Sequence, residues 1–380
     1  MSHDRDITIV PVQGKKDLDA FLRLPWRIQQ SDPNWVPPLL AHQRKLLDPA
    51  RGPFFEIGEA SYFLALQDGR PVGRLSAHVN HRHDEMYHDD TGFFGFFECM
   101  DDARVAAALF ESAADWLRKR GKRRMRGPMS FGIYDEIGLL IDGFDSMPAM
   151  LQVHNPRYYA GLLEAWGFQK ALDWYALKIT RETAIGMADM QHKLDDIMEK
   201  QSLRLVPATP ADIVRRKREV FDLFNEAWNA NWGHVPFTWK QFETIISELK
   251  PVLRTDLMRL ILTPQDEIAA FIITIPDLNA AIQKMNGRLT PLGLLRLYYE
   301  ARLKPLGKLR TVLLGVRRDY QRKRLHHALI LSSYLDFDKR STINFCDLSL
   351  IPENLSLYLR ALAKYGATRY KTWRIYDRDI

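Results

Sequence analysis

Short apolar runs and amphipathic stretches alternate through the first half of the chain. Residues 61–67 and 71–80 are apolar runs joined by an Asp-Gly pair, which is typical of a tight hairpin between two strands. Residues 92–99, very rich in Phe, predict a third strand. Apolar residues then recur every three or four positions up to about Arg120, which predicts an amphipathic helix capped by the Asp-Asp pair at 101–102. This order of elements predicts a mixed α/β domain.

The same order of runs returns in the second half. Residues 257–262 and 268–275 predict another hairpin, and residues 309–316 predict the strand that follows it. A helix is expected from about Tyr320 to Asp336, and a further strand, helix and strand lead to the end of the chain. The second half therefore repeats the element order of the first.

The two halves also end alike. A Trp follows a helix-ending glycine after seven residues in both of them, because Gly167 leads to Trp174 and Gly366 leads to Trp373. Such self-similarity indicates a duplicated unit, and 380 residues exceed what one compact core usually serves. We therefore expect two tandem α/β domains.

Charge narrows the choice of partners. The chain carries a net charge of +7, and its basic residues cluster at 118–124, 215–218 and 317–324. Such clusters suit an anionic partner, which can be nucleic acid, an anionic membrane, an acidic carrier protein or a phosphorylated cofactor; they also arise simply as solvated helix faces. Nucleic acid is not expected, because the clusters lack the interleaved aromatic residues that line single-strand grooves.

The remaining composition indicates the compartment. Residues 1–6 are polar and carry no signal peptide, and no apolar run approaches the roughly 18 residues of a membrane span. Cys99 and Cys346 lie in apolar, strand-like runs without metal-ligand spacing, as buried reduced thiols do. We expect a cytoplasmic protein, with peripheral contact at the inner membrane as an option.

The strand ending at residues 314–316 and the segment after it resemble the acyl-CoA site of the GNAT superfamily of N-acyltransferases. Members have Arg or Gln, two residues, Gly, one residue, and Gly or Ala before a helix; here Gln321 fits, but Arg324 and His326 replace the small residues. The resemblance implies that backbone N–H groups at the helix start bind the CoA pyrophosphate. The implied cofactor-binding residues are Leu314, Gly315, Val316, Gln321, Arg322, Lys323, Arg324, Leu325 and His326.

The first half lacks this site. Two carboxylates at the N-terminus of its helix, Asp101 and Asp102, would repel phosphate. The resemblance thus implies two GNAT-like domains, each a mixed, mostly antiparallel sheet flanked by helices. Residues 1–180 would form a domain without a cofactor site that lines the acceptor side. Residues 202–380 would form the domain that holds the acyl donor.

Over nearly its full length the chain resembles a narrower family of bacterial double-GNAT proteins that includes the bacterial ceramide synthases. The resemblance implies transfer of an acyl group, long-chain in this family, from acyl-CoA or acyl carrier protein to an amine such as a sphingoid base or 3-ketosphinganine. No tightly bound cofactor is expected. The segments that carry the resemblance include 32–38, 94–98, 138–145, 154–156, 231–233, 276–279 and 371–376.

Four residues are catalytic candidates. GNAT enzymes often use a Tyr on the helix after the fifth strand to protonate the leaving thiolate, and Tyr358 matches it. Asp347 and Glu353 flank the end of the same strand and are candidate bases. His154, in a loop of the first half, is a candidate base or acceptor-orienting group. Each of the four also has a purely structural interpretation.

Two other functions are compatible with parts of the sequence, and one group of histidines resembles a metal site. A tandem-GNAT aminoacyl transferase that uses charged tRNA is compatible with the basic clusters, and a non-catalytic protein that binds acyl-CoA or lipid is compatible with the missing loop glycines. His81 and His83 would share one face of a strand, but no second ligand cluster accompanies them, so we expect no metal site.

Overall fold

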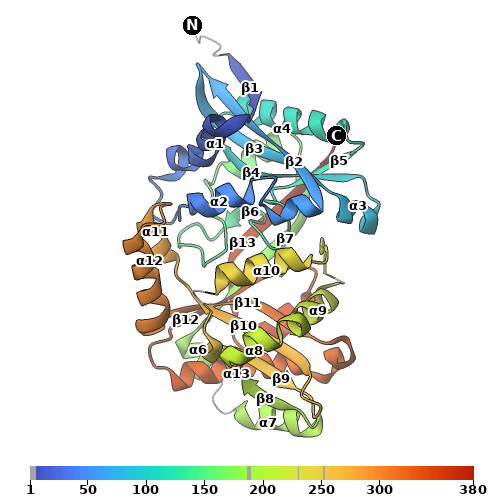
Figure 1. The fold of residues 1–380 in the computed structure, drawn as a ribbon, viewed down its shortest axis with the longest axis vertical. Coiled ribbons are helices and arrows are strands. Elements are labelled where there is room, and N and C mark those ends of the chain that lie inside the picture. Colours follow the sequence, from blue (N-terminus) through green and yellow to red (C-terminus); the bar gives the residue numbers. More distant parts are fainter. Residues whose placement is uncertain (1–5, 186–189, 230, 251–252) are drawn as a thin grey trace. The chain divides into compact units, whose positions relative to one another are not determined.

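The computed structural model describes residues 6–185, 190–229, 231–250 and 253–380 (Figure 1). The start of the polar N-terminal segment, residues 1–5, and residues 186–189 between the two halves lie outside this range. The chain forms two compact units. The first consists of Met1–Trp174, Asn279–Gly293 and Lys371–Ile380, and the second of Tyr175–Leu278 and Leu294–Tyr370.

The sheet of the first unit has the strand order β1-β2-β3-β4-β5-β13, with β6 paired to β13. All pairs are antiparallel except β4 with β5, which is parallel. The hairpin predicted before and after residues 68–69 is confirmed as β2 and β3. The strands are β1 (Ile7–Pro11), β2 (Gly58–Gln67), β3 (Arg70–Asn80), β4 (Thr91–Cys99), β5 (Arg124–Gly127), β6 (Leu139–Asp142) and β13 (Thr368–Asp379).

Helices cover both faces of this sheet. Gly73 and Arg74 are neighbours on β3 and point to opposite faces. A Cβ on Gly73 would meet the Leu109 side chain of α4, whereas Arg74 reaches the Phe21 carbonyl of α1. The predicted helix cap is confirmed, because the Asp102 side chain accepts a hydrogen bond from the Arg104 amide. The helices are α1 (Gly14–Gln29), α2 (Leu40–Leu46), α3 (His81–Tyr87), α4 (Ala103–Arg118), α5 (Tyr159–Ala165) and α11 (Asn279–Met285).

The second unit repeats the arrangement with the order β7-β12-β11-β10-β9-β8. Its central pair, β11 with β12, is again parallel, and the predicted hairpin is confirmed as β9 and β10. The strands are β7 (Gln169–Thr180), β8 (Arg204–Pro207), β9 (Met258–Leu262), β10 (Ile268–Pro276), β11 (Lys308–Val316) and β12 (Phe345–Pro352). The helices are α6 (Arg181–Ile185), α7 (Gln191–Lys200), α8 (Pro210–Arg215), α9 (Lys217–Trp228), α10 (Trp239–Leu249), α13 (Leu325–Lys339) and α14 (Ser356–Lys364).

The compact units do not follow the order of the chain. Strand β13, at the end of the chain, pairs with β5 of the first unit, so that Tyr376 lies opposite Gly127. Strand β7, which closes the first half in sequence, neighbours β12 of the second unit. The contacts thus assign residues 371–380 to the first unit and 175–180 to the second, whereas the repeat in the sequence suggested boundaries at 180 and 202.

Two local features differ from what the sequence suggests. Pro25 lies inside α1, where a proline usually breaks a helix, yet α1 continues through it. Proline lacks the N–H that would bond to the Phe21 carbonyl, and here the Arg74 guanidinium donates to that carbonyl instead, at 2.7 Å. His81 and His83 lie in the helix α3 and not on a strand. Within the described residues, no group of three or more His, Cys, Asp or Glu side chains is placed to hold a metal ion.

Candidate active site

Each unit opens where its two parallel strands diverge. In the second unit, β11 and β12 pair only over 308–311 and 345–348, and a cavity of about 850 Å³, open mouth included, lies beyond that point. In the first unit, β4 and β5 pair only over 91–93 and 124–126, and a cavity of about 730 Å³ lies beyond them. The duplicated fold therefore presents two cavities at equivalent places.

The cavity of the second unit has mainly apolar walls. Its polar groups are few, and they include Gln321, His326 and Tyr358. The ring of Tyr358, on α14, lies 6.4 Å from the ring of His326 between centroids. Burial raises the pKa of Tyr358, so its phenol carries its proton at neutral pH. The apolar lining comes from Val312, Leu313, Leu314, Val316, Leu348, Leu350, Ile351 and Leu355.

His326 lies in the first turn of α13. Burial, together with neighbouring His327, lowers the pKa of His326 to about 4, so its imidazole is neutral at physiological pH. Its neighbour has another partner, because His327 Nδ1 lies 2.8 Å from the hydroxyl of Tyr365. The cavity thus places a neutral imidazole and a protonated phenol on the same walls.

The loop before α13 has a positive backbone φ angle at the position where GNAT members have glycine. Arg324, at the position where GNAT members have Gly, has φ of +60°, in the left-handed region that glycine favours. The side chains of residues 321–324 are exposed, so the Arg324 side chain does not fill the loop. The segment Arg318–Lys323 is a 3₁₀ turn, where the sequence had suggested that the helix starts.

Positive charge at this loop is only partly neutralised. Arg317 is held by Asp319, at 2.9 Å, and by Glu267, at 2.8 Å. Within the described residues, by contrast, no ion pair joins Arg322, Lys323 or Arg324 to a carboxylate. These three exposed cations stand at the N-terminus of α13, where the helix dipole is also positive.

The predicted cofactor-binding residues lie in four different places. Leu314, Val316, Gln321 and His326 line the cavity, while Arg322, Lys323 and Arg324 are exposed and do not line it. Gly315 faces the other side of β11, where a Cβ would lie 2.6 Å from the Phe271 ring. Leu325 is fully buried in the core between α13 and the sheet.

The predicted bases of the second half lie outside the cavity lining. Asp347 on β12 is fully buried and bonds to the hydroxyls of Ser349 and, at 2.7 Å, Tyr370; the Arg310 guanidinium lies 3.4 Å away. Glu353, just beyond β12, accepts a hydrogen bond from the Tyr175 hydroxyl at 3.2 Å. Of the four catalytic candidates, only Tyr358 lines this cavity.

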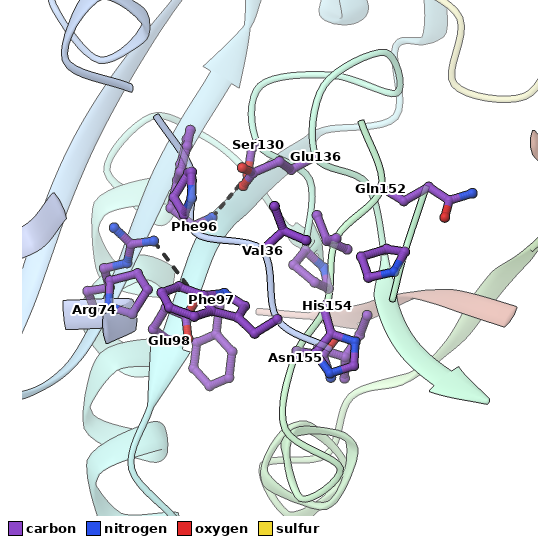
Figure 2. A pocket seen from close by; sticks show the side chains of 18 residues that line it. Val36, Arg74, Phe96, Phe97, Glu98, Ser130, Glu136, Gln152, His154 and Asn155 are labelled. Carbon is purple, nitrogen blue, oxygen red and sulfur yellow. Dashed lines mark hydrogen bonds and ion pairs between the residues drawn. The ribbon is translucent and has the colours of Figure 1, made fainter. Parts of the chain in front are cut away.

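His154 lines the cavity of the first unit, whose walls carry more ionisable groups (Figure 2). Its Nε2 lies 2.9 Å from Asp32 Oδ2. Burial lowers the pKa of His154, and the hydrogen bond with Asp32 opposes that shift. Figure 2 shows Arg74 beside Glu98, and Ser130 beside Glu136, on other walls of the same cavity.

Sequence reasoning missed Glu98 as a residue of this site. Glu98 accepts hydrogen bonds from Gln29, at 2.9 Å, and from the Tyr159 hydroxyl, at 2.6 Å, and Arg74 lies 4.0 Å away. Burial raises the pKa of Glu98, and Arg74 opposes that shift. A carboxylate within the Phe-rich run 93–99 was the signal that could have revealed it, because an ionised group in a buried strand needs a partner.

Comparison with known proteins places the chain in a family. No protein-family model matches the chain. Protein YghO of Escherichia coli is 33% identical over 371 residues, which cover 97% of this chain and 94% of that protein. The bacterial ceramide synthase of Caulobacter vibrioides is 31% identical over 396 aligned positions, covering 100% of this chain and 99% of that protein.

Solved structures agree on the fold. A tandem GNAT protein from the clavulanic acid biosynthesis pathway superposes with a TM-score of 0.55 at 13% identity, covering 98% of each chain. A GCN5-related N-acetyltransferase from Sphaerobacter thermophilus gives 0.51 at 13% identity, covering 98% of this chain and 95% of that one. The fold is thus a tandem GNAT fold. The chain belongs to the bacterial family of tandem GNAT N-acyltransferases that contains the Caulobacter enzyme.

Proposed function

We propose that the protein moves a long-chain acyl group from an acyl thioester, either acyl-CoA or acyl carrier protein, to an amine, with the thioester held in the cavity of the second unit. The observation that carries this proposal is the mainly apolar cavity between β11 and β12, with exposed cations at residues 322–324 before α13. Apolar walls suit a hydrocarbon chain, and the cations suit the phosphates of the carrier.

The residues of the cavity can serve this reaction. The amine nitrogen attacks the thioester carbonyl, a C–N bond forms, and the C–S bond breaks. The neutral imidazole of His326 can take the proton that the nitrogen loses, and the phenol of Tyr358 can protonate the leaving thiolate. A proton passing from the imidazolium to the phenolate restores both groups, so the net products are an amide and a free thiol.

The acceptor is proposed from the relative. The name of the Caulobacter protein, bacterial ceramide synthase, supports a sphingoid base or 3-ketosphinganine as the amine. A coupled assay tests this with palmitoyl-CoA or palmitoyl carrier protein, offered with sphinganine, 3-ketosphinganine or a short-chain amine. Free thiol and amide appearing together support transfer. Acyl thioester bound without amide from any amine would contradict it and favour a binding protein.

An exposed apolar surface supports docking on a membrane. Helix α12 (Pro291–Tyr298) and the π-helical turn after it, Tyr299–Leu303, expose large side chains: Leu295 is 67% and Leu303 65% exposed. Arg296 and Arg302 are exposed beside them and have no ion pair within the described residues. Apolar residues flanked by free Arg suit the surface of an anionic bilayer.

Vesicle sedimentation tests this docking. We expect the protein to sediment with vesicles containing phosphatidylglycerol and less with phosphatidylcholine alone, and a Leu295→Glu, Leu303→Glu variant to stay in the supernatant. Equal sedimentation of both proteins would reject the surface, and self-association lost in the variant would identify a second copy as its occupant. Among the described residues, no helix has both the length and the apolar composition to cross a membrane.

A further inference from the structure

The cavity of the first unit contains a histidine with one ring nitrogen unsatisfied. The side chain of His154 is 1% exposed, and its Nε2 lies 2.9 Å from Asp32 Oδ2. An ionised carboxylate only accepts hydrogen bonds, so the Nε2 of a neutral His154 carries the proton and Nδ1 is left with a lone pair. Within the described residues, Nδ1 is buried and has no hydrogen-bond partner. A buried acceptor without a donor is costly unless a ligand provides one.

Glu136 is a second acceptor on the walls of the same cavity. Its Oε1 accepts a hydrogen bond from Gln43 Nε2 at 3.1 Å, and its Oε2 from the Ser130 hydroxyl at 3.3 Å. Both donors are neutral. In the part of the chain that the structure describes, no cation lies within ion-pair distance of this carboxylate.

Glu98, another carboxylate of this cavity, has both a nearby cation and hydrogen-bond donors. It has a cation, Arg74, at 4.0 Å, in addition to its hydrogen bonds from Gln29 and Tyr159. Arg74 interacts electrostatically with both Glu98 and Glu136, so one cation stands against two carboxylates on these walls. The walls thus carry one uncompensated carboxylate and one unsatisfied imidazole nitrogen, both of which require a donor.

We infer that the cavity of the first unit binds an amino alcohol, whose primary ammonium group donates to Glu136 and whose further N–H or O–H donates to His154 Nδ1. The ammonium group supplies the missing positive charge and several N–H donors. A hydroxyl oxygen can also accept from the Nε–H of Arg74, a buried donor without a partner in the described structure. Apolar residues such as Trp35, Val36 and Val153 complete the walls beside any hydrocarbon part.

This inference deepens the proposed function, on which it rests in one respect: the amino alcohol, after its ammonium group has given one proton to solvent, is then the neutral amine that accepts the acyl group. The site itself is defined by the walls of one unit. Each lining residue belongs to residues 25–155, so binding can be measured without acyl donor.

Calorimetry with a soluble short-chain sphinganine tests the site, with the N-acetyl derivative as the comparison ligand. We expect the free amine to bind more tightly than the N-acetyl compound, which has lost the charge. Glu136→Gln keeps the shape and removes the charge, and it should weaken binding of the amine about tenfold or more. Asp135→Asn removes a charge one residue away, at an exposed side chain outside the cavity lining, and should leave binding unchanged.

His154→Gln provides an independent variant and should also weaken binding of the amine at least several-fold. Full-length proteins are compared, and thermal unfolding of each variant checks that it is folded. Unchanged amine affinity in both variants, or equal affinity for the N-acetyl compound, would overturn the inference. A variant that does not fold is replaced by Glu136→Asp, which keeps the charge and should keep binding of the amine.

The outcome separates this inference from the proposed function. If Glu136→Gln still forms amide with an unchanged KM for the amine, the proposed amine site is rejected and the proposed acyltransferase activity is retained. If amine binding depends on Glu136 but no acyl thioester gives an amide, the proposed reaction is rejected and the amine site is retained.

Discussion

The two cavities lie at equivalent places in their units but differ in chemistry. In the first unit, the helix after β4 starts beside Asp101 and Asp102, and the cavity walls carry Arg74, Glu98, Glu136 and His154. In the second unit, α13 follows a run of exposed cations, and the walls are mainly apolar. Duplication supplies the same opening twice, and we propose that the charge at the next helix determines which opening binds the phosphorylated donor.

The largest effect is expected from the phenol of the second cavity. Tyr358→Phe removes the proposed proton donor to the thiolate and keeps the ring, so the rate of amide formation should fall about 100-fold or more. Single-turnover measurement with saturating palmitoyl-CoA and sphinganine gives that rate. The control is Tyr365→Phe at the end of the same helix, whose hydroxyl contacts His327 outside the cavity lining. Equal rates in the two variants would exclude Tyr358 as the acid.

Charge reversal at the loop is expected to have a smaller effect. Arg322→Glu with Lys323→Glu should raise the KM for palmitoyl-CoA about tenfold, with little change in kcat, and should reduce the salt dependence of that KM. The matched control reverses two exposed cations of the first unit, Arg70→Glu with Lys119→Glu. If both double variants raise KM alike, general surface charge and not this loop attracts the donor.

The smallest expected effect is on the stability of the protein in acid. It compares His78, in the core of the first unit, with His154, in the wall of the cavity. His78 is fully buried among Phe54, Phe93 and Phe131, and both of its ring nitrogens lack partners within the described residues. Burial lowers the pKa of His78 to about 3, from 6.5. Below pH 6.5, His78 is therefore protonated in the unfolded chain but stays neutral in the folded protein. The free energy of unfolding consequently decreases as the pH falls towards 3.

His78→Phe should remove that contribution. Since one proton changes the slope by about 1.4 kcal/mol per pH unit, urea unfolding between pH 6 and 4 should show a shallower loss of stability in the variant. His81→Asn, at an exposed position, serves as the control and should keep the original slope. Parallel stability curves for the wild type and His78→Phe would show that His78 is not the group responsible.

Local features of the fold were predictable from the sequence. The two hairpins and the helix α4 with its Asp102 cap follow from short patterns, because turn residues and apolar periodicity act within a few positions. The duplication was also visible in the sequence. The continuation of α1 through Pro25 was not, because the compensating Arg74 guanidinium lies 53 residues further along the chain.

The cavities were only half predictable for the same reason. Gln321 and His326 lie within the motif that suggested them, and Tyr358 lies on the helix that the family resemblance indicated. The partners of His154 do not: Asp32 is 122 residues away in sequence, and no local pattern links the two. Asp347 was predicted to be a base because it lies at the end of a strand. That position in the sequence cannot reveal that Arg310 and two hydroxyls surround it.

The position of β13 has a consequence for synthesis of the protein. Its residues 376–379 pair with residues 124–127, so the sheet of the first unit lacks a strand until the last residues of the chain are available. On a ribosome, the first half must wait with the edge of β5 unpaired while the second half is translated, and contacts this distant in sequence form slowly. The sheet of the first unit is therefore completed only when β13 has been synthesised and pairs with β5.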